Sequence, residues 1–235
     1  MNIIITGASQ GIGFEVVRQL SKDSANHIIA IARNKENLEK LVDICLKENP
    51  KSNVKTIHFD IGNTRYFESD LKPEIFRSFN NIDILINNAG ALVRKPIEQI
   101  TSEEIDDLMN INFKSPFLLI KMLLPYFNKG SHIVNMSSMG GFQGSAKFKG
   151  LSLYSSAKAA IASLSESLAL ELSNRKIFVN AIAPGAVQTE MLATAFPGFQ
   201  APLNPSEFAE FICYFAINGH KFFNGKILPV SLATP

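Results

Sequence analysis

Cysteine and charge are both scarce in this sequence, and each shortage excludes a class of protein. The chain of 235 residues contains two cysteines, Cys45 and Cys213, which are too few and too far apart for a disulfide scaffold and are typical of a reducing compartment. Charged residues make up 19% of the chain, and the formal net charge is +2. Because nucleic acid binding needs many lysines and arginines against the phosphates, we expect no nucleic acid partner.

Metal-ligand pairs and long apolar runs are also scarce, and we expect no secretory leader. The four histidines never form an H-x-x-x-H pair, so we expect no metal site. No uninterrupted apolar run reaches the roughly 20 residues that a membrane-spanning helix requires. Residues 2–5 begin an apolar strand with no basic region before it. We therefore expect a cytoplasmic protein with no membrane partner.

What the sequence does contain is a regular alternation of short apolar runs and longer helical patterns. The runs are rich in Ile and Val and are apolar at both odd and even positions, as expected for strands buried on both faces of a parallel sheet. We predict strands at residues 2–6, 27–32, 54–59, 83–87, 132–136, 178–183 and 226–230, and helices at 12–21, 35–47, 65–79, 102–127, 153–172 and 206–217. This alternation predicts an α/β fold, a doubly wound three-layer sandwich with a seven-stranded parallel sheet.

No repeat or linker interrupts the alternation, so we predict one domain over residues 1–235. Proline and glycine gather between residues 184 and 205. Ligands bind beyond the carboxyl edge of such a sheet. We therefore interpret residues 189–204 as a substrate loop at that edge.

A glycine-rich turn follows the first predicted strand. Its sequence is G-x-x-x-G-x-G, with glycine at Gly7, Gly11 and Gly13. Glycines allow a tight turn in which backbone N–H groups approach a diphosphate, and the following helix N-terminus favours an anion electrostatically. A turn of this kind after the first strand of a β-α-β unit predicts a dinucleotide site, although such a turn can also be a plain connection.

The second predicted strand ends at a basic residue. Arg33 lies 20 residues beyond Gly13, with Lys35 close behind, and no Asp or Glu occupies the strand end. An acidic residue there binds the ribose 2′-hydroxyl of NAD, whereas an arginine accommodates the 2′-phosphate of NADP. The sequence therefore favours NADP(H) over NAD(H).

A tyrosine and a lysine open the helical pattern that begins near residue 153. Tyr154 and Lys158 are four residues apart, which places them on one helix face. An ammonium beside a phenol favours the phenolate, so we expect Lys158 to lower the pKa of Tyr154. A phenol tuned in this way can act as a general acid or base on a carbonyl or alcohol oxygen.

Together with three further motifs, these features resemble the short-chain dehydrogenase/reductase family, in its compact single-domain branch. The further motifs are N-N-A-G at residues 87–90, N-M-S-S at 135–138 and P-G-A-V-Q-T at 184–189. The resemblance covers essentially the whole chain and implies a Rossmann-type fold. It also implies a homodimer or homotetramer built through the helices at 102–127 and 153–172.

The resemblance assigns roles to individual residues. It implies that Tyr154 is the general acid/base, that Lys158 is its partner and binds the nicotinamide ribose, and that Ser138, rather than Ser137, bonds the substrate oxygen. It implies that Asn112, rather than Asn110, holds a water in a proton relay. The implied cofactor contacts are Gly7, Ser9, Gln10, Gly11, Ile12, Gly13, Arg33, Asp60, Ile61, Asn88, Ala89, Gly90, Tyr154, Lys158, Pro184, Gly185, Val187 and Thr189.

The expected activity is reversible hydride transfer between NADP(H) and a carbonyl or secondary alcohol. Apolar candidates for the substrate pocket, Phe142, Phe148, Leu192 and Phe196 beside Ser138, favour a small hydrophobic ketone. The interval between Ser138 and Tyr154 is a few residues longer than the family commonly shows. The alternative is a non-catalytic dinucleotide-binding regulator or scaffold of the same fold. An enoyl reductase is disfavoured because its tyrosine and lysine lie further apart.

Overall fold

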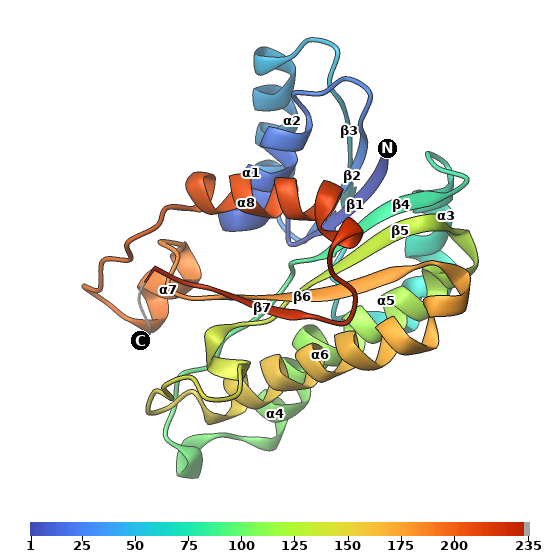
Figure 1. Cartoon of the computed structure of the whole chain (residues 1–235). Coiled ribbons are helices and arrows are strands. Elements are labelled where there is room, and N and C mark those ends of the chain that lie inside the picture. Colours follow the sequence, from blue (N-terminus) through green and yellow to red (C-terminus); the bar gives the residue numbers. More distant parts are fainter. Residues whose placement is uncertain (233–235) are drawn as a thin grey trace.

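A computed structural model describes residues 1–232 and contains one parallel sheet of seven strands (Figure 1). The strand order is β3-β2-β1-β4-β5-β6-β7, which confirms the predicted doubly wound fold with seven parallel strands. The strands are β1 (Asn2–Thr6), β2 (His27–Ala32), β3 (Asn53–His58), β4 (Ile82–Asn87), β5 (Phe127–Met136), β6 (Phe178–Pro184) and β7 (Ile227–Val230). The helices are α1 (Gly11–Leu20), α2 (Lys35–Glu48), α3 (Lys72–Phe76), α4 (Ser102–Met109), α5 (Ser115–Leu123), α6 (Ser152–Glu171), α7 (Glu190–Ala195) and α8 (Pro205–Asn218).

Two helical layers cover the two faces of the sheet. In Figure 1, α1, α2 and α8 lie on one face, and α3, α4, α5 and α6 lie on the other. The side chains of β1 show how one strand serves both layers: Ile3 and Ile5 belong to the core beneath α1, α2 and α8, while Ile4 belongs to the core beneath α3, α5 and α6. All three are fully buried, which accounts for the continuous apolar runs in the sequence.

The order of the strands reverses between β1 and β4. From β1 the chain proceeds outward to β2 and β3, and from β4 it proceeds in the opposite direction to β7. The connections that leave the carboxyl ends of β1 and β4 therefore diverge and leave a crevice between them, which is where ligands bind in sheets of this kind.

The strands β3, β4, β6 and β7 differ from their predicted bounds by one residue, and β5 starts five residues earlier than predicted, at Phe127. Three other predicted segments differ in kind. The stretch at 65–79 is not one helix: it contains a single 3₁₀ turn, a π turn over Phe67–Leu71 and the short α3. The stretch at 102–127 is divided by a π turn at Asn110–Lys114 and ends before Phe127, where β5 begins. The segment 189–204 contains the helix α7, which starts where the Thr189 side chain accepts a hydrogen bond from Leu192 N at 3.2 Å.

No helix in the described part of the chain combines the length and hydropathy that a membrane span requires. Within residues 1–232, His, Cys, Asp and Glu side chains nowhere gather in groups of three or more that could hold a metal ion. Cys45 and Cys213 are both free thiols.

Candidate active site

The glycine turn after β1 lies directly against the turn after β4. A Cβ atom on Gly7 would lie 2.7 Å from the Ala89 Cα, and one on Gly13 would lie 2.4 Å from the Gly7 carbonyl oxygen and from the Asn88 Nδ2. Gly7 and Gly11 have φ values of 70° and 58°, in the left-handed region that glycine tolerates. The close approach and the backbone conformation therefore both require glycine here.

Asn88 and Thr6 join these two turns by hydrogen bonds. The Asn88 Nδ2 donates to the carbonyl oxygens of Thr6 and Gly7, at 3.1 Å each. The Thr6 hydroxyl oxygen accepts from the backbone N–H groups of Asn88 and Ala89, also at 3.1 Å. The Asn88 side chain is thus committed to holding the glycine turn in shape.

The N-terminus of α1 opens into the crevice beside this turn. Its N-cap residue, Gln10, makes no side-chain capping bond, so the first N–H groups of the helix stay available to an anion. The glycine cradle and the uncapped helix N-terminus fit the diphosphate of a dinucleotide. Gly7, Ser9, Gln10, Gly11 and Ile12 are the residues that would hold it.

A basic and an acidic side chain face each other at the far end of the crevice. Arg33 follows β2 and Asp60 follows β3, and their Nη1 and Oδ2 atoms are 3.9 Å apart. Asp60 is further fixed because its Oδ1 accepts from Gly62 N at 2.9 Å. The Arg33 side chain is 69% exposed, so it is free to turn toward a phosphate.

The proposed catalytic side chains converge near the carboxyl end of β5. Tyr154 and Lys158 project from the first turns of α6, and the Lys158 Nζ lies 5.9 Å from the centroid of the Tyr154 ring. Ser138 follows β5, and its oxygen accepts a hydrogen bond from Gly140 N at 3.1 Å. The Lys158 Nζ donates to the Met136 carbonyl oxygen at 2.8 Å, which holds the amine beside the strand end.

Burial determines the protonation of this pair in the protein alone. It raises the pKa of the Tyr154 phenol, while hydrogen bonding to Ser138 acts in the opposite direction. It lowers the pKa of Lys158 to about 8. The expected lowering of the Tyr154 pKa is therefore not found in the chain by itself, because burial outweighs the hydrogen bond to Ser138.

Asn112 lies in the π turn between α4 and α5. Its Nδ2 donates to the Ala91 and Leu108 carbonyl oxygens at 2.9 and 3.1 Å, and its Oδ1 accepts from Ala91 N at 3.2 Å. Both Nδ2 protons are thus used, one of them in positioning the segment after Gly90, while the Oδ1 can accept one further hydrogen bond. A π turn interrupts the regular helical ladder and is frequent at functional sites.

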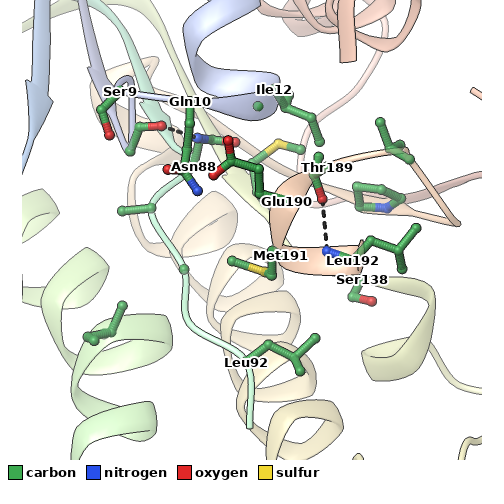
Figure 2. A pocket seen from close by; sticks show the side chains of 18 of the residues that line it. Ser9, Gln10, Ile12, Asn88, Leu92, Ser138, Thr189, Glu190, Met191 and Leu192 are labelled. Carbon is green, nitrogen blue, oxygen red and sulfur yellow. Dashed lines mark hydrogen bonds between the residues drawn. The ribbon is translucent and has the colours of Figure 1, made fainter. Parts of the chain in front are cut away.

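One large cavity, of about 1180 Å³, connects these groups. Figure 2 shows residues of the glycine turn on one side of it and those of α7 on another, with Ser138 and Leu92 further along. Among the predicted cofactor contacts, it is lined by Gly7, Ser9, Gln10, Gly11, Ile12, Arg33, Asp60, Ile61, Asn88, Ala89, Gly90, Tyr154, Lys158, Pro184, Gly185, Val187 and Thr189. Among the predicted substrate contacts, it is lined by Ser138, Phe148, Leu192 and Phe196.

Three predicted site residues do not line this cavity. Gly13 lies beneath the glycine turn and Asn112 behind Gly90, so both shape the wall from outside. Phe142 is a correction: the chain leaves the turn at Met139–Gly141 in an extended conformation at Phe142, and its ring does not reach the wall. Met139, Glu190 and Met191 line the cavity but were not predicted, since no motif singles them out.

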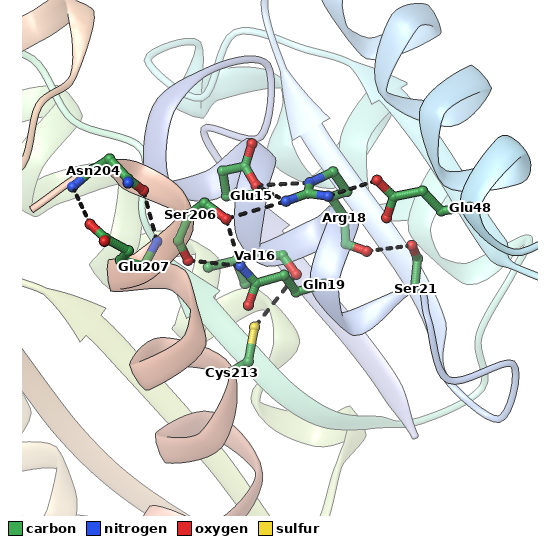
Figure 3. A network of polar contacts seen from close by, with 10 residues as sticks. All are labelled: Glu15, Val16, Arg18, Gln19, Ser21, Glu48, Asn204, Ser206, Glu207 and Cys213. Carbon is green, nitrogen blue, oxygen red and sulfur yellow. Dashed lines mark hydrogen bonds and ion pairs between the residues drawn. The ribbon is translucent and has the colours of Figure 1, made fainter.

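A second, smaller cavity of about 480 Å³ lies between α1 and α8. Figure 3 shows that Arg18 there is surrounded by partners: its guanidinium donates to Glu15, Glu48 and Ser206. The Cys213 Sγ points at the Val16 carbonyl oxygen, 3.7 Å away, and burial raises the pKa of this thiol to about 12. These contacts join α1 to α8 and, through Glu48, to α2.

The fold and the crevice together define a dinucleotide-binding α/β protein. A family model described as short chain dehydrogenase matches residues 1–198. The hydroxynaphthalene reductase-like protein Arp2 of Metarhizium brunneum (strain ARSEF 3297) is 33% identical over 192 residues, covering 80% of this chain and 68% of that protein. The uncharacterized oxidoreductase YhxC of Bacillus subtilis (strain 168) is 32% identical over 243 residues, covering 98% and 83%.

The solved structure of levodione reductase has the same fold, with a TM-score of 0.86 and 24% identity over 98% of this chain and 95% of that one. The chain belongs to the short-chain dehydrogenase/reductase family. It is an oxidoreductase of that family, which acts on carbonyl or alcohol groups with a nicotinamide cofactor.

Proposed function

We propose that this chain is an NADP(H)-dependent reductase of small hydrophobic ketones. The observation that carries the proposal is the convergence of Ser138, Tyr154 and Lys158 at one region of a cavity that also contains the glycine turn and Arg33. The catalytic unit would be a single domain, with residues 189–204 as its substrate loop.

The chain's own residues can bind the carbonyl oxygen and supply its proton. A bound nicotinamide dinucleotide would supply or accept the hydride. Tyr154 would donate its phenolic proton to the carbonyl oxygen, and the Ser138 hydroxyl would bond the same oxygen as charge develops on it, a role that can be worth ~3 kcal/mol. The raised pKa of Tyr154 keeps the phenol protonated and ready to act as an acid.

Lys158 and Asn112 would support this proton transfer. With a pKa of about 8, Lys158 can return a proton toward the tyrosine near neutral pH. Asn112 would act through the segment after Gly90 and, as the family resemblance implies, by holding a water. The cavity wall around Ser138 is mostly apolar, with Leu92, Met139 and Leu151 among its members, so it favours an uncharged substrate.

The name of the Arp2 relative supports an aromatic substrate, since it refers to hydroxynaphthalene reduction. The test is a panel of apolar ketones and diketones, with NADPH or NADH oxidation followed by absorbance. Tyr154→Phe should reduce turnover by at least ~100-fold, the usual contribution of a general acid, while the dissociation constant of NADPH changes little. Substantial residual activity in this variant would refute the assignment. Cofactor binding without turnover of any substrate would favour the regulator alternative.

The preference for NADP(H) rests on Arg33 and is tested separately. Arg33→Ala should weaken NADPH binding by about tenfold or more, the loss expected for a charge-assisted hydrogen bond to phosphate. NADH binding should be nearly unchanged, because NADH lacks the 2′-phosphate. Tighter binding of NADH than NADPH by the wild-type protein would refute the preference.

We also propose a homodimer or homotetramer formed through α4, α5 and α6. Ile105 on α4 and Phe117 on α5 are large apolar residues with exposures of 43% and 41%. Light scattering tests the assembly, and a monomeric mass at micromolar concentration would contradict it.

A further inference from the structure

Three segments far apart in the sequence meet at the rim of the large cavity. They carry Arg94, after β4; Phe148, between β5 and α6; and Phe196, directly after α7. The Arg94 guanidinium carbon lies 4.3 Å from the centroid of the Phe196 ring. The Phe148 and Phe196 rings are 5.9 Å apart and meet edge to face, at 74°. We call Arg94, Phe148 and Phe196 the clasp.

Arg94 also closes the C-terminal end of α7. Its Nη1 donates to the Ala195 carbonyl oxygen at 2.7 Å, one of the last carbonyls that a helix cannot bond internally. A cation is favoured at this end of a helix, and a charge-assisted hydrogen bond is among the stronger ones. The planar guanidinium can bond a carbonyl while stacking on a ring, which a lysine ammonium cannot do in the same way.

The stem of Arg94 packs against the third segment. A Cβ atom on Gly150 would lie 3.2 Å from the Arg94 Cγ, and Lys95 N donates to the Gly150 carbonyl oxygen at 3.0 Å. The 91–96 segment therefore makes two contacts. Its backbone binds the lengthened stretch before Tyr154, and its Arg94 side chain binds α7. At its other end, α7 is capped by Thr189.

The clasp divides into an inner and an outer part. Phe148 and Phe196 line the cavity that contains Ser138 and Tyr154, whereas Arg94 does not line it. The arginine is therefore placed to fix Phe196 directly, and Phe148 through Phe196, without itself lining the cavity. Removing the Arg94 side chain would keep both phenylalanines in the chain, but their rings would no longer be held in one position.

We propose that Arg94 is a positioning residue for substrate binding: by holding Phe196 against Phe148, it keeps α7 closed over the apolar end of the cavity. This inference rests on the proposed reduction of apolar ketones. It assigns Arg94 no contact with substrate, cofactor or reacting atoms.

The test compares Arg94→Ala with the matched control Lys95→Ala. The Lys95 side chain forms an ion pair with Glu104 of α4 and does not line the cavity, so the control removes a neighbouring cation without touching the clasp. In Arg94→Ala, backbone amides of residues 190–199 should exchange with solvent about tenfold faster, because a charged hydrogen bond and a cation–π contact are both lost. Chymotrypsin should cut after Phe199, which is followed by Gln200, correspondingly faster. Neither rate should change in Lys95→Ala.

The kinetic readout separates positioning from general damage. Arg94→Ala should raise KM for an apolar ketone by about tenfold, with kcat and the dissociation constant of NADPH within about twofold of wild type. Arg94→Lys should recover only part of the KM, since the ammonium cannot both stack and bond.

Unchanged amide exchange in Arg94→Ala would refute the proposal that Arg94 holds α7 in place. Faster exchange with an unchanged KM would overturn the positioning role alone, while the proposed function would stand. If the wild-type protein reduces no ketone, the proposed function fails and the positioning role fails with it, even if the exchange rates differ as expected.

Discussion

His132 is the side chain whose protonation should most affect the stability of the fold. It lies on β5 with 1% exposure. Its Nδ1 is 3.0 Å from the Ala216 carbonyl oxygen, which can only accept, so this nitrogen carries the proton. Its Nε2 is 3.0 Å from the Asn180 Nδ2, which donates, so this nitrogen must be unprotonated. Both nitrogens are therefore satisfied by the neutral imidazole.

A second proton on His132 would be buried without an acceptor. Burial, with His220 nearby, lowers the pKa of His132 to about 4, from 6.5. Because the pKa is lower in the folded state, the unfolded chain binds more protons as the pH falls below 6.5. The stabilising contribution of the neutral ring is thus complete above about pH 6.5 and is lost as the pH falls through 4. At about 1.4 kcal/mol per pKa unit, the loss is about 3 kcal/mol.

The assay is urea unfolding at a series of pH values between 7.5 and 4. The wild-type protein should lose about 3 kcal/mol more free energy of unfolding over this range than His132→Gln does, which removes the titrating ring and leaves the carboxylates unchanged. His27→Gln, at the exposed start of β2, is the control and should follow the wild type. Parallel pH profiles for wild type and His132→Gln would refute the reasoning.

Two further predictions concern the site and its support. Gly13→Ala should abolish measurable NADPH binding and destabilise the fold by about 1–3 kcal/mol, because its Cβ would meet the Gly7 carbonyl oxygen at 2.4 Å; wild-type affinity, measured by fluorescence titration, would contradict this geometry. Ser165→Ala should cost about 1–3 kcal/mol in thermal or urea unfolding, because it leaves the Asn135 Nδ2, bonded to Ser165 Oγ at 2.9 Å, without an acceptor. Ser167→Ala, on the exposed face of the same helix, should change stability by less than about 0.5 kcal/mol; equal losses in the two variants would contradict the second prediction.

The sheet could be predicted from the sequence because its strands are buried on both faces. The runs beginning at Asn2 and His27 are apolar at nearly every position, and their observed bounds match the prediction. The edge strand β3 was displaced by one residue, since Lys55 and Thr56 face solvent there and weaken the apolar signal. The irregular helix after Thr64 could not be predicted, because a π turn has the same apolar residues as an α-helix and differs only in its hydrogen bonds.

Residues of the site that belong to a motif could be predicted, whereas those placed by packing could not. Tyr154 and Lys158 share a face through helical spacing alone. Phe142 and Phe148 could not be told apart by sequence, because the direction of each ring depends on the turn between them. Arg94 gave no signal at all, since nothing about an arginine in a loop predicts the ring and the carbonyl that it meets.

The π turn at Asn110–Lys114 has a consequence for the phase of the helix that it interrupts. It inserts one extra residue into the turn, and each helical residue advances the direction of a side chain by about 100°. The buried face of α5 is therefore shifted by about 100° from where an uninterrupted α-helix continuing α4, with its buried Leu108, would place it. Deleting one residue within 110–114 would restore a continuous α-helix only by rotating either Asn112 away from Ala91 or α5 away from its core. Asn112 can contact Ala91 while α5 packs against its core only if the π turn is kept.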